Sequence, residues 1–181
     1  MLAGGKTSRC PLNGVILKTY YAPVGTQPLD AAGLLYILGL MDVFSMVQRL
    51  VATHGEEGIC PSAADWQAIL ELPEQPFAIL NLLKFRKHVE VDGRELAGAA
   101  AYRQYSAAVA SAFQRHGGTR LFIGRVAHFF PQDLDDWDLA VLARYPNPIA
   151  LAQMWLDGDF ISAHRHRLTG VERSGVLLLE G

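Results

Sequence analysis

The stretch FAILNLLKFR, from Phe77 to Arg86, decides the fold of this chain. Its side chains are apolar on both alternating faces, except for Asn81 in the middle and the basic residues Lys84 and Arg86 at the end. A strand with this pattern is typical of the centre of a sheet that is covered on both faces. Because a buried amide without a partner costs about 1–3 kcal/mol, Asn81 needs a hydrogen-bonding neighbour.

Strand and helix patterns alternate after this stretch. A polar loop with Asp92-Gly93 as its turn leads to a long helix, where apolar side chains recur every three or four residues. Asn147 opens a later helix and Asp159 caps another. The predicted elements are strands over 77–85, 119–126, 137–145 and 176–180, and helices over 97–116, 148–156 and 160–169. This order is that of the ferredoxin-like split βαβ fold, an α+β domain with a four-stranded antiparallel sheet.

The two central strands of that fold, over 77–85 and 137–145, are the most continuously apolar runs. Their helices can cover only one face of the sheet, whereas both faces of these strands are apolar. The second face therefore needs another layer, and the sheet of a partner subunit is the simplest candidate. The sequence predicts a homodimer.

Two shorter regions precede this domain. Repeated glycine and proline interrupt residues 1–28, and Met41 opens an amphipathic helix that Gly55 ends. A short helix follows over 63–72. Met41 is also a candidate natural start, which an intact mass that includes residues 1–40 would contradict. We divide the chain into a poorly structured extension over 1–40, a helical extension over 41–75 and the ferredoxin-like domain over 76–181.

The composition excludes several classes of protein. Of 181 residues, 50% are hydrophobic and 19% are charged, so the chain is globular rather than disordered. A net charge of −2 gives no excess of positive charge for binding nucleic acid or an anionic membrane. Cys10 and Cys60 have no metal or redox spacing, and the apolar run over 31–41 is shorter than the roughly 20 residues of a membrane span. We expect a cytoplasmic protein without metal, cofactor, nucleic-acid or membrane partners.

Two residues are candidates for catalysis. Asn81 either orients a ligand carbonyl, an enol or bound oxygen, or it is a strand asparagine bonded to a helix terminus or water. His164 and His166 diverge by roughly 200° on a helix, so they do not share a metal. His166 is the preferred acid or base, because histidine titrates near neutrality. The alternative is an exposed helix face with a loose salt bridge to Glu172.

Three further residues are candidates for substrate binding. Tyr105 lies on the buried face of the long helix, where its phenol hydroxyl needs a partner. Trp137 begins the third strand of the domain. Arg144 would pair with an anionic substrate if it is buried, and with solvent if it lies at a strand end.

Four segments in order, FAILNLLKFR, AAYRQYSAAV with HGG, WDLAVLARYPNP and DFISAHRHRLTGVERS, resemble domain-of-unknown-function family 1330. The resemblance covers about residues 76–181. It implies the dimeric α/β-barrel group, in which two ferredoxin-like subunits pair their sheets. That group includes cofactor-free monooxygenases, small isomerases and lyases, and haem enzymes, while the family itself has no settled activity. Asn81 matches the family's NLL segment, and His166 with Arg167 match its His-Arg pair, which implies a binding role for Arg167.

Two functional hypotheses follow. The first is a homodimeric small-molecule-binding protein, extending to a cofactor-free enzyme of monooxygenase or isomerase/lyase type that works on an enolisable substrate. The second is a non-enzymatic ligand carrier or a structural accessory dimer. Haem binding is weaker than either, because no histidine stands out as an axial ligand. The choice depends on whether Asn81 faces the helices, as a pocket residue, or the partner sheet, as an interface residue.

Overall fold

The computed structural model describes residues 31–129 and 136–180. The elements in chain order are α1 (Ala31–His54), α2 (Ala63–Leu70), β1 (Phe77–Phe85), β2 (Val89–Val91), β3 (Arg94–Leu96), α3 (Gly98–Ala108), α4 (Ala110–Arg115), β4 (Thr119–Arg125), β5 (Leu139–Tyr145), α5 (Pro148–Trp155), α6 (Gly158–Gly170) and β6 (Val171–Glu180). None of these described helices is both long enough and apolar enough to pass through a bilayer.

The main sheet has four strands in the order β4-β5-β1-β6, and all its pairs are antiparallel. β1 and β5 are the two central strands, with Phe77 opposite Tyr145 and Asn81 opposite Val141. This order of strands is that of the ferredoxin-like fold. The predicted fold, with its α+β class and its two central strands, is confirmed.

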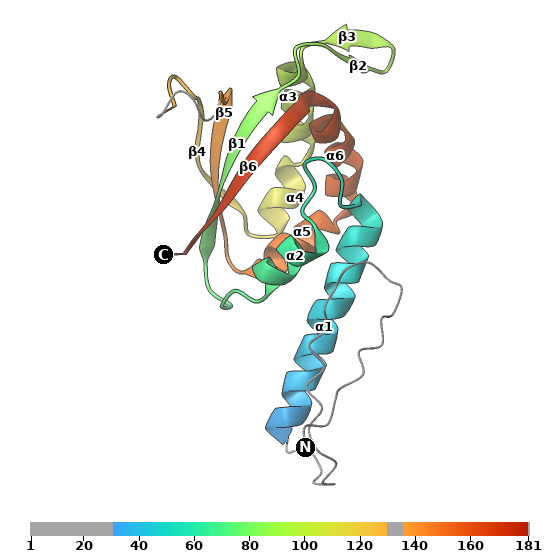
Figure 1. The fold of residues 1–181 in the computed structure, drawn as a ribbon, viewed down its shortest axis with the longest axis vertical. Helices are drawn as coiled ribbons and strands as arrows, with labels where there is room; N and C mark the ends of the chain where they lie inside the picture. The colour runs from blue at the N-terminus through green and yellow to red at the C-terminus, as the bar shows by residue number, and fades with distance from the viewer. Residues whose placement is uncertain (1–30, 130–135, 181) are drawn as a thin grey trace, which may run out of the picture.

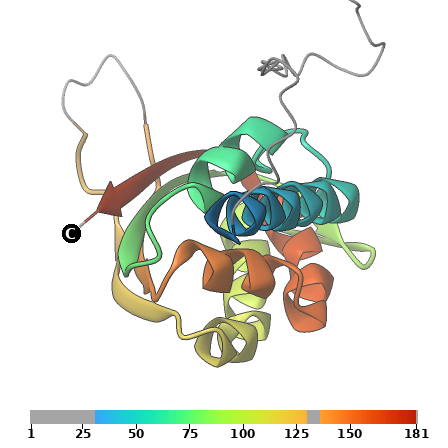
Figure 2. The same cartoon turned by 90° about the horizontal axis from the view of Figure 1, so that it is seen from below.

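All described helices lie on one face of the main sheet (Figures 1 and 2). Along β1 the buried side chains alternate: Phe77, Ile79 and Leu83 are buried beneath the helices. The intervening side chains, such as Leu80 and Leu82, are only half-buried, because they project from the face without helices. We call this second surface the open face.

The buried side chains form two clusters on the helix side. The larger cluster joins α1, α2, α5 and α6 to one end of the sheet and includes Leu50, Trp66, Phe77, Ile79 and Phe160. The smaller cluster consists of Leu83, Tyr102 and Val171, with half-buried neighbours that include Phe85. Asn81 lies between the two clusters along β1, since the residues on either side of it on the same face belong to different clusters.

Several predicted boundaries agree with the structure. β1 covers the predicted range, Ser62 begins α2 through a capping box with Asp65, and the Asn147 side chain caps α5. The predicted polar loop after β1 is instead a short hairpin of β2 and β3, which projects beyond the sheet in Figure 1. Its turn places Asp92 and Gly93 at φ of 50° and 75°, which an Asp-Gly pair tolerates better than most residues.

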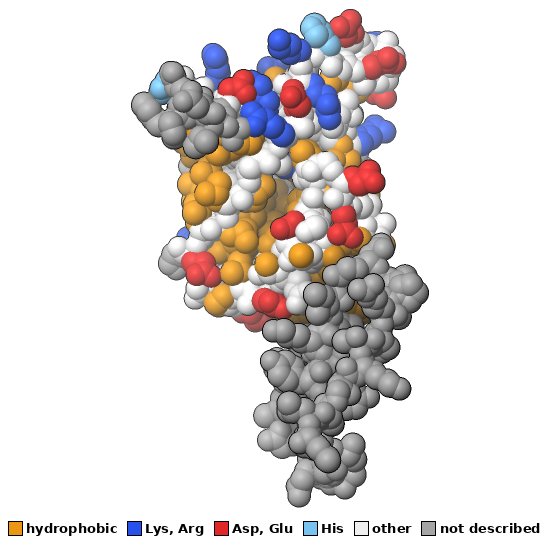
Figure 3. All heavy atoms as spheres, viewed as in Figure 1, with side chains coloured by type: hydrophobic (Ala, Val, Ile, Leu, Met, Phe, Trp, Pro, Cys, Tyr) orange, Lys and Arg blue, Asp and Glu red, His pale blue; other side chains and the backbone are white. Residues whose placement is uncertain are grey.

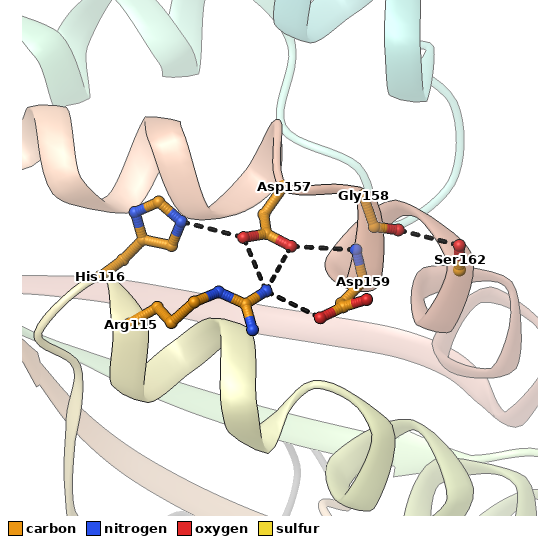
Figure 4. Close-up of polar contacts among 6 residues, drawn as sticks. All are labelled: Arg115, His116, Asp157, Gly158, Asp159 and Ser162. Carbon is orange, nitrogen blue, oxygen red and sulfur yellow. Dashed lines mark hydrogen bonds and ion pairs between the residues drawn. The ribbon is translucent and has the colours of Figure 1, made fainter.

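The helix and strand at the end of the chain begin earlier than predicted. Asp157, not Asp159, caps α6, since its carboxylate accepts the Asp159 backbone N–H at 2.9 Å. Arg115 and His116 also donate to Asp157, at 2.9 and 3.1 Å (Figure 4). The hydrogen bonds from Arg115 lower the pKa of Asp157 to about 2. β6 follows α6 directly from Val171, five residues before the predicted start, so no loop separates the two elements.

The long predicted helix is divided into α3 and α4 at Val109, and Gly117 ends the second part at φ 74°. α1 is one continuous helix from Ala31, so residues 31–40 extend the helix that the sequence analysis begins at Met41. Residues 1–30 of the predicted poorly structured extension lie outside the described residues. The division of the chain into three regions stays a prediction.

Two glycines bring α3 and α6 into backbone contact. A Cβ on Gly98 would meet the Gly170 carbonyl oxygen, and it would lie 2.6 Å from the Arg86 carbonyl oxygen. The same backbones are linked by hydrogen bonds, from Arg86 N–H to Gly170 O at 3.0 Å and from Gly98 N–H to Arg86 O at 2.9 Å. This contact sets the separation of the two helices one turn before Tyr102 and one turn after Arg167.

Candidate functional site

Asn81 faces the helices. It shares its face of β1 with Ile79 and Leu83, both buried, and its neighbours in register are Val141 on β5 and Val176 on β6. Its side-chain amide is half-buried and makes no hydrogen bond to any residue within 31–129 or 136–180, so the predicted bond to a helix terminus is not observed there. Val176 beside it is 51% exposed, so the helical layer is open toward the β6 edge.

Arg167 is the second polar residue of this interior. Its side chain is only 6% exposed, on the face of α6 that points into the molecule. One terminal guanidinium nitrogen donates to the Ile59 carbonyl oxygen at a long 3.5 Å. No carboxylate of the described residues lies within ion-pair distance of it. The predicted alternative was an exposed helix face with a loose salt bridge to Glu172. It is wrong for Arg167, because this residue is buried.

Three tyrosines lie close to Arg167. Burial raises the pKa of Tyr102, Tyr105 and Tyr145, while the positive charge of Arg167 acts in the opposite direction on each. The rings of Tyr102 and Tyr105 are in contact, with centroids 5.4 Å apart. None of the three hydroxyl groups has a hydrogen-bond partner within the described part of the chain. At neutral pH they are protonated phenols, able both to donate and to accept.

A histidine pair lies next to this group. His54 at the end of α1 and His164 in α6 meet through their Nδ1 atoms at 3.2 Å, and His54 Nε2 is 2.7 Å from the Trp155 carbonyl oxygen. Since a carbonyl can only accept, His54 is protonated on Nε2, and its Nδ1 accepts the proton of His164 Nδ1. His164 Nε2 is then a buried acceptor, without a partner in the described structure.

Aromatic rings enclose His164. The centroids of Trp155, Phe160 and Tyr105 lie 4.9, 5.2 and 6.5 Å from its ring. Burial, aided by the charges of Arg167 and His54, lowers the pKa of His164 to about 3. Burial also lowers the pKa of His54. Both imidazoles are therefore neutral at physiological pH. The ring of Tyr105 lies near both His164 and Tyr102, so the histidine pair adjoins the tyrosines around Arg167.

The structure brings only part of the predicted site together. Asn81, Tyr105 and Arg167 lie on the helix side of the sheet. His166 neighbours Arg167 along α6 but is half-buried and makes no hydrogen bond to another described residue. Arg144 pairs in register with Ala78, so it lies on the open face and is exposed.

Trp137 also lies on the open face. Its ring packs 3.4 Å from the position that a Cβ would take on Gly175, beside Leu82, and the Arg173 guanidinium stacks over it at 4.7 Å. Asp136 accepts from Arg173 at 3.0 Å and also pairs with Lys84. Trp137 and Arg144 are thus separated from Asn81 by the thickness of the sheet.

Neither His54 nor the burial of Arg167 was predicted from the sequence. Ile161 and Leu168, the large apolar residues three and four positions from His164, are about 40% exposed in the structure. The buried stripe of α6 is instead Phe160, Ala163, His164, Arg167 and Gly170. The spacing of three and four residues in that set was a usable signal, although the polar members obscured it.

Arg167 is covered at the surface. Among the described residues, the α1–α2 loop passes over Arg167, since Ile59 in that loop provides its carbonyl contact. Two shallow depressions lie elsewhere: one of about 370 Å³ against the hairpin and one of about 300 Å³ beside β4. Asn81, His166 and Arg167 line neither of them. The described residues also contain no group of three or more histidine, cysteine, aspartate or glutamate side chains able to hold a metal.

Comparison with known proteins supplies two solved structures of useful similarity. The protein RPA0582 from Rhodopseudomonas palustris, of unknown function, matches with a TM-score of 0.61 and 29% identity over 68% of this chain and 96% of that one. Its methylated form matches with a TM-score of 0.54 and 33% identity over 60% and 82%. A dimeric ferredoxin-like protein of unknown function from Bacteroides fragilis has a TM-score of 0.41 and 13% identity over 59% and 96%. No family model matches the chain, and no curated protein matches it.

Proposed function

This chain belongs to the same family as RPA0582 of Rhodopseudomonas palustris, a protein of unknown function, and we propose that it is a homodimeric small-molecule-binding protein. The site lies between the sheet and the helices of each subunit. The same proposal includes three narrower points about the protein. They are membership of domain-of-unknown-function family 1330, a barrel-like pairing of the sheets of two subunits, and a cytoplasmic location.

The observation that supports a ligand site is a group of side chains on the helix side of the sheet that leave most of their hydrogen-bonding capacity unused within the described residues. It consists of the Arg167 guanidinium, the phenols of Tyr102, Tyr105 and Tyr145, and the nearby amide of Asn81. Polar groups beneath a packed layer are paired in most folded proteins. A bound molecule that hydrogen-bonds with several of these side chains would use their free capacity, which is a source of affinity.

An enzymatic role within this site is a further part of the proposal. His166 would be the base that takes a proton from an enolisable substrate, and Asn81 would hold the resulting oxygen. The neutral, enclosed His164 is not suited to that role, because burial keeps it from carrying a proton. A carrier or accessory dimer module is the alternative, which the covering of Arg167 by the α1–α2 loop favours. A substrate screen in which Asn81→Ala and His166→Ala leave an activity unchanged would contradict the catalytic assignment.

The open face supports the homodimer. Figure 3 shows a contiguous apolar area on this face, and three large members of it, Phe122, Leu177 and Leu179, are 57%, 46% and 40% exposed. Register places Leu177 beside Leu80, and Phe122 beside Leu142, on the face opposite the helices. Large exposed apolar patches are typical of protein interfaces. A second copy would cover this patch with an equivalent apolar sheet.

We expect the protein to have twice the 19.8 kDa mass of one chain in light scattering at micromolar concentration. Leu177→Arg introduces two like charges into the paired faces and is expected to give monomers. Leu168→Arg is the matched control, since Leu168 is exposed on α6, away from the sheet, and should leave the dimer intact. A monomeric wild-type protein would contradict the homodimer.

Ligand binding is tested separately by thermal-shift screening against a library of neutral and anionic small molecules. A hit at the proposed site should lose its effect in Tyr105→Phe, which deletes one hydroxyl and keeps the ring. Tyr20→Phe, outside the predicted ferredoxin-like domain over 76–181, is the control and should keep the effect. If hits are equally strong in both variants, ligands bind elsewhere, and if the whole library gives none, the binding function is wrong.

A further inference from the structure

We propose that the interior site takes a small organic carboxylate, bound through the Arg167 guanidinium with the neighbouring phenol hydroxyls. This inference rests on the proposed small-molecule site and adds the chemical class of its ligand. It follows from the balance of charge, from the geometry of the donors and from the character of the surrounding side chains.

The charge balance around Arg167 is uneven. Arg167 as a whole residue is only 6% exposed, and no carboxylate of the described residues pairs with its guanidinium. The titratable groups that its charge influences are Cys60, His164 and the three tyrosines, and burial favours the neutral form of every one. Arginine itself stays charged inside proteins. Among the residues that the structure describes, this positive charge has no counterion, and an anionic ligand would neutralise it.

The donors suit a planar anion with two oxygens. A guanidinium presents parallel N–H groups that match a carboxylate in a bidentate contact. The single bond that Arg167 makes, to Ile59 O at 3.5 Å, leaves most of its five N–H donors for a ligand. Tyr102 and Tyr105 add hydroxyl donors from α3, a helix held close to α6 by the Gly98–Gly170 contact.

The remaining surroundings suit an apolar body on that carboxylate. Tyr102 contacts Phe85 at a centroid distance of 5.3 Å, and Tyr105 contacts Phe160 at 6.1 Å. Aromatic rings bind planar apolar groups through face and edge contacts. The site thus combines one guanidinium group with surrounding aromatic rings. This combination favours an aryl or other apolar carboxylate over a hydrophilic anion such as phosphate.

Ile59 O occupies the position next to the guanidinium in this structure. Its loop, between α1 and α2, contains Gly55 and Gly58 in the left-handed region, at φ of 72° and 67°. The long bond between Ile59 O and Arg167 is weak. A carboxylate that replaces this carbonyl forms a charge-assisted pair, so the loop is the segment that moves when ligand enters.

The test uses calorimetry with matched probes on the full chain: benzoate and phenylacetate against the uncharged benzamide and phenylacetamide. We expect the acids to bind the wild type and the amides to bind much more weakly. Arg167→Met should weaken binding of the acids by about 10- to 100-fold, as for loss of a charged hydrogen bond. Arg165→Met is the matched control, because Arg165 is exposed on the same helix, and it should bind as the wild type does.

Thermal unfolding without ligand gives a second readout. Arg167→Met removes an uncompensated buried charge, so it should raise the melting temperature by about 2–4 °C or more. Arg165→Met should leave it unchanged. Arg167→Lys keeps the charge without the guanidinium group, and it should fold like the wild type while binding the acids more weakly. This second variant keeps the test valid even where methionine fits poorly.

The outcomes separate the ligand class from the site itself. Equal binding of amides and acids, unaffected by Arg167→Met but lost in Tyr105→Phe, would overturn the carboxylate and keep the small-molecule site. A clear fall in melting temperature for both Arg167→Met and Arg167→Lys would show that the guanidinium has a structural partner, and would overturn the inference. If neither the acids nor the amides bind and the library also gives no hits, the inference and the proposed function are both wrong.

Discussion

Gly98→Ala is expected to destabilise the fold by about 3 kcal/mol or more, at the upper end of what one added methyl group costs in a packed interior. The new Cβ would meet the Gly170 carbonyl oxygen and would lie 2.6 Å from the Arg86 carbonyl oxygen. Both obstacles are backbone atoms, and the same backbones are joined by the hydrogen bonds between Arg86, Gly98 and Gly170. Neither can retreat without weakening those bonds.

Urea unfolding followed by circular dichroism measures this effect. The matched control is Gly158→Ala, since a Cβ there would have no neighbour within 4 Å, and alanine favours a helix over glycine by about 1 kcal/mol. We expect this control to be neutral or slightly stabilising. Equal stability of the two variants would mean that α3 and α6 do not cross as closely as described. If Gly98→Ala folds at low temperature, it should also bind ligand poorly, because Tyr102 would move away from Arg167.

Acidification is expected to destabilise the protein through His164 well before its carboxylates are protonated. The pKa of His164 is about 3 in the folded protein, below the value near 6.5 of an unfolded chain. The unfolded chain therefore binds the proton more readily, and stability falls as pH decreases below about 6.5. From these two values the loss is about 2 kcal/mol between pH 7 and pH 5, and it grows until pH approaches 3. His54 acts in the same direction.

Urea midpoints at pH 7, 6 and 5 measure this loss, and His164→Phe should reduce it, because the variant retains a ring and cannot titrate. Phe160→Leu is the control: it creates a cavity in the same cluster, so it should lower stability at each pH and keep the same slope. A wild-type midpoint that is constant from pH 7 to pH 5 would contradict the enclosed histidine pair. The Asp157 carboxylate, with its pKa of about 2, affects stability only at lower pH than this range.

The fold could be predicted because its signals are local. The uninterrupted apolar pattern of Phe77–Phe85, the proline after Asn147 and the glycine at 117 each specify an element or its end, and the order of elements specifies the topology. Boundaries were wrong where two residues competed for one role. Asp157 and Asp159 both suit a helix cap, and the choice depends on Arg115 and His116, which lie about 40 residues away.

The site was less predictable, because burial of a polar residue depends on distant partners. Asn81 and Tyr105 could be identified from their apolar neighbours along one strand and one helix. Arg167 entered only through a family resemblance, since an arginine on an amphipathic helix normally lies in solvent. His54 meets His164 across 110 positions of sequence, and no local pattern indicates that contact. Trp137 and Arg144 were placed with Asn81, although the pleat of the sheet directs them to the other face.

The positions of the three tryptophans give the molecule three separate optical reporters. Trp66 is buried in the large cluster, Trp155 contacts the ring of His164 in α6, and Trp137 lies on the open face against Gly175. Indole emission responds to local polarity and to charged neighbours. Variants that retain a single tryptophan would therefore distinguish three events by fluorescence alone: unfolding through Trp66, protonation of the histidine pair through Trp155, and formation of the proposed dimer through Trp137.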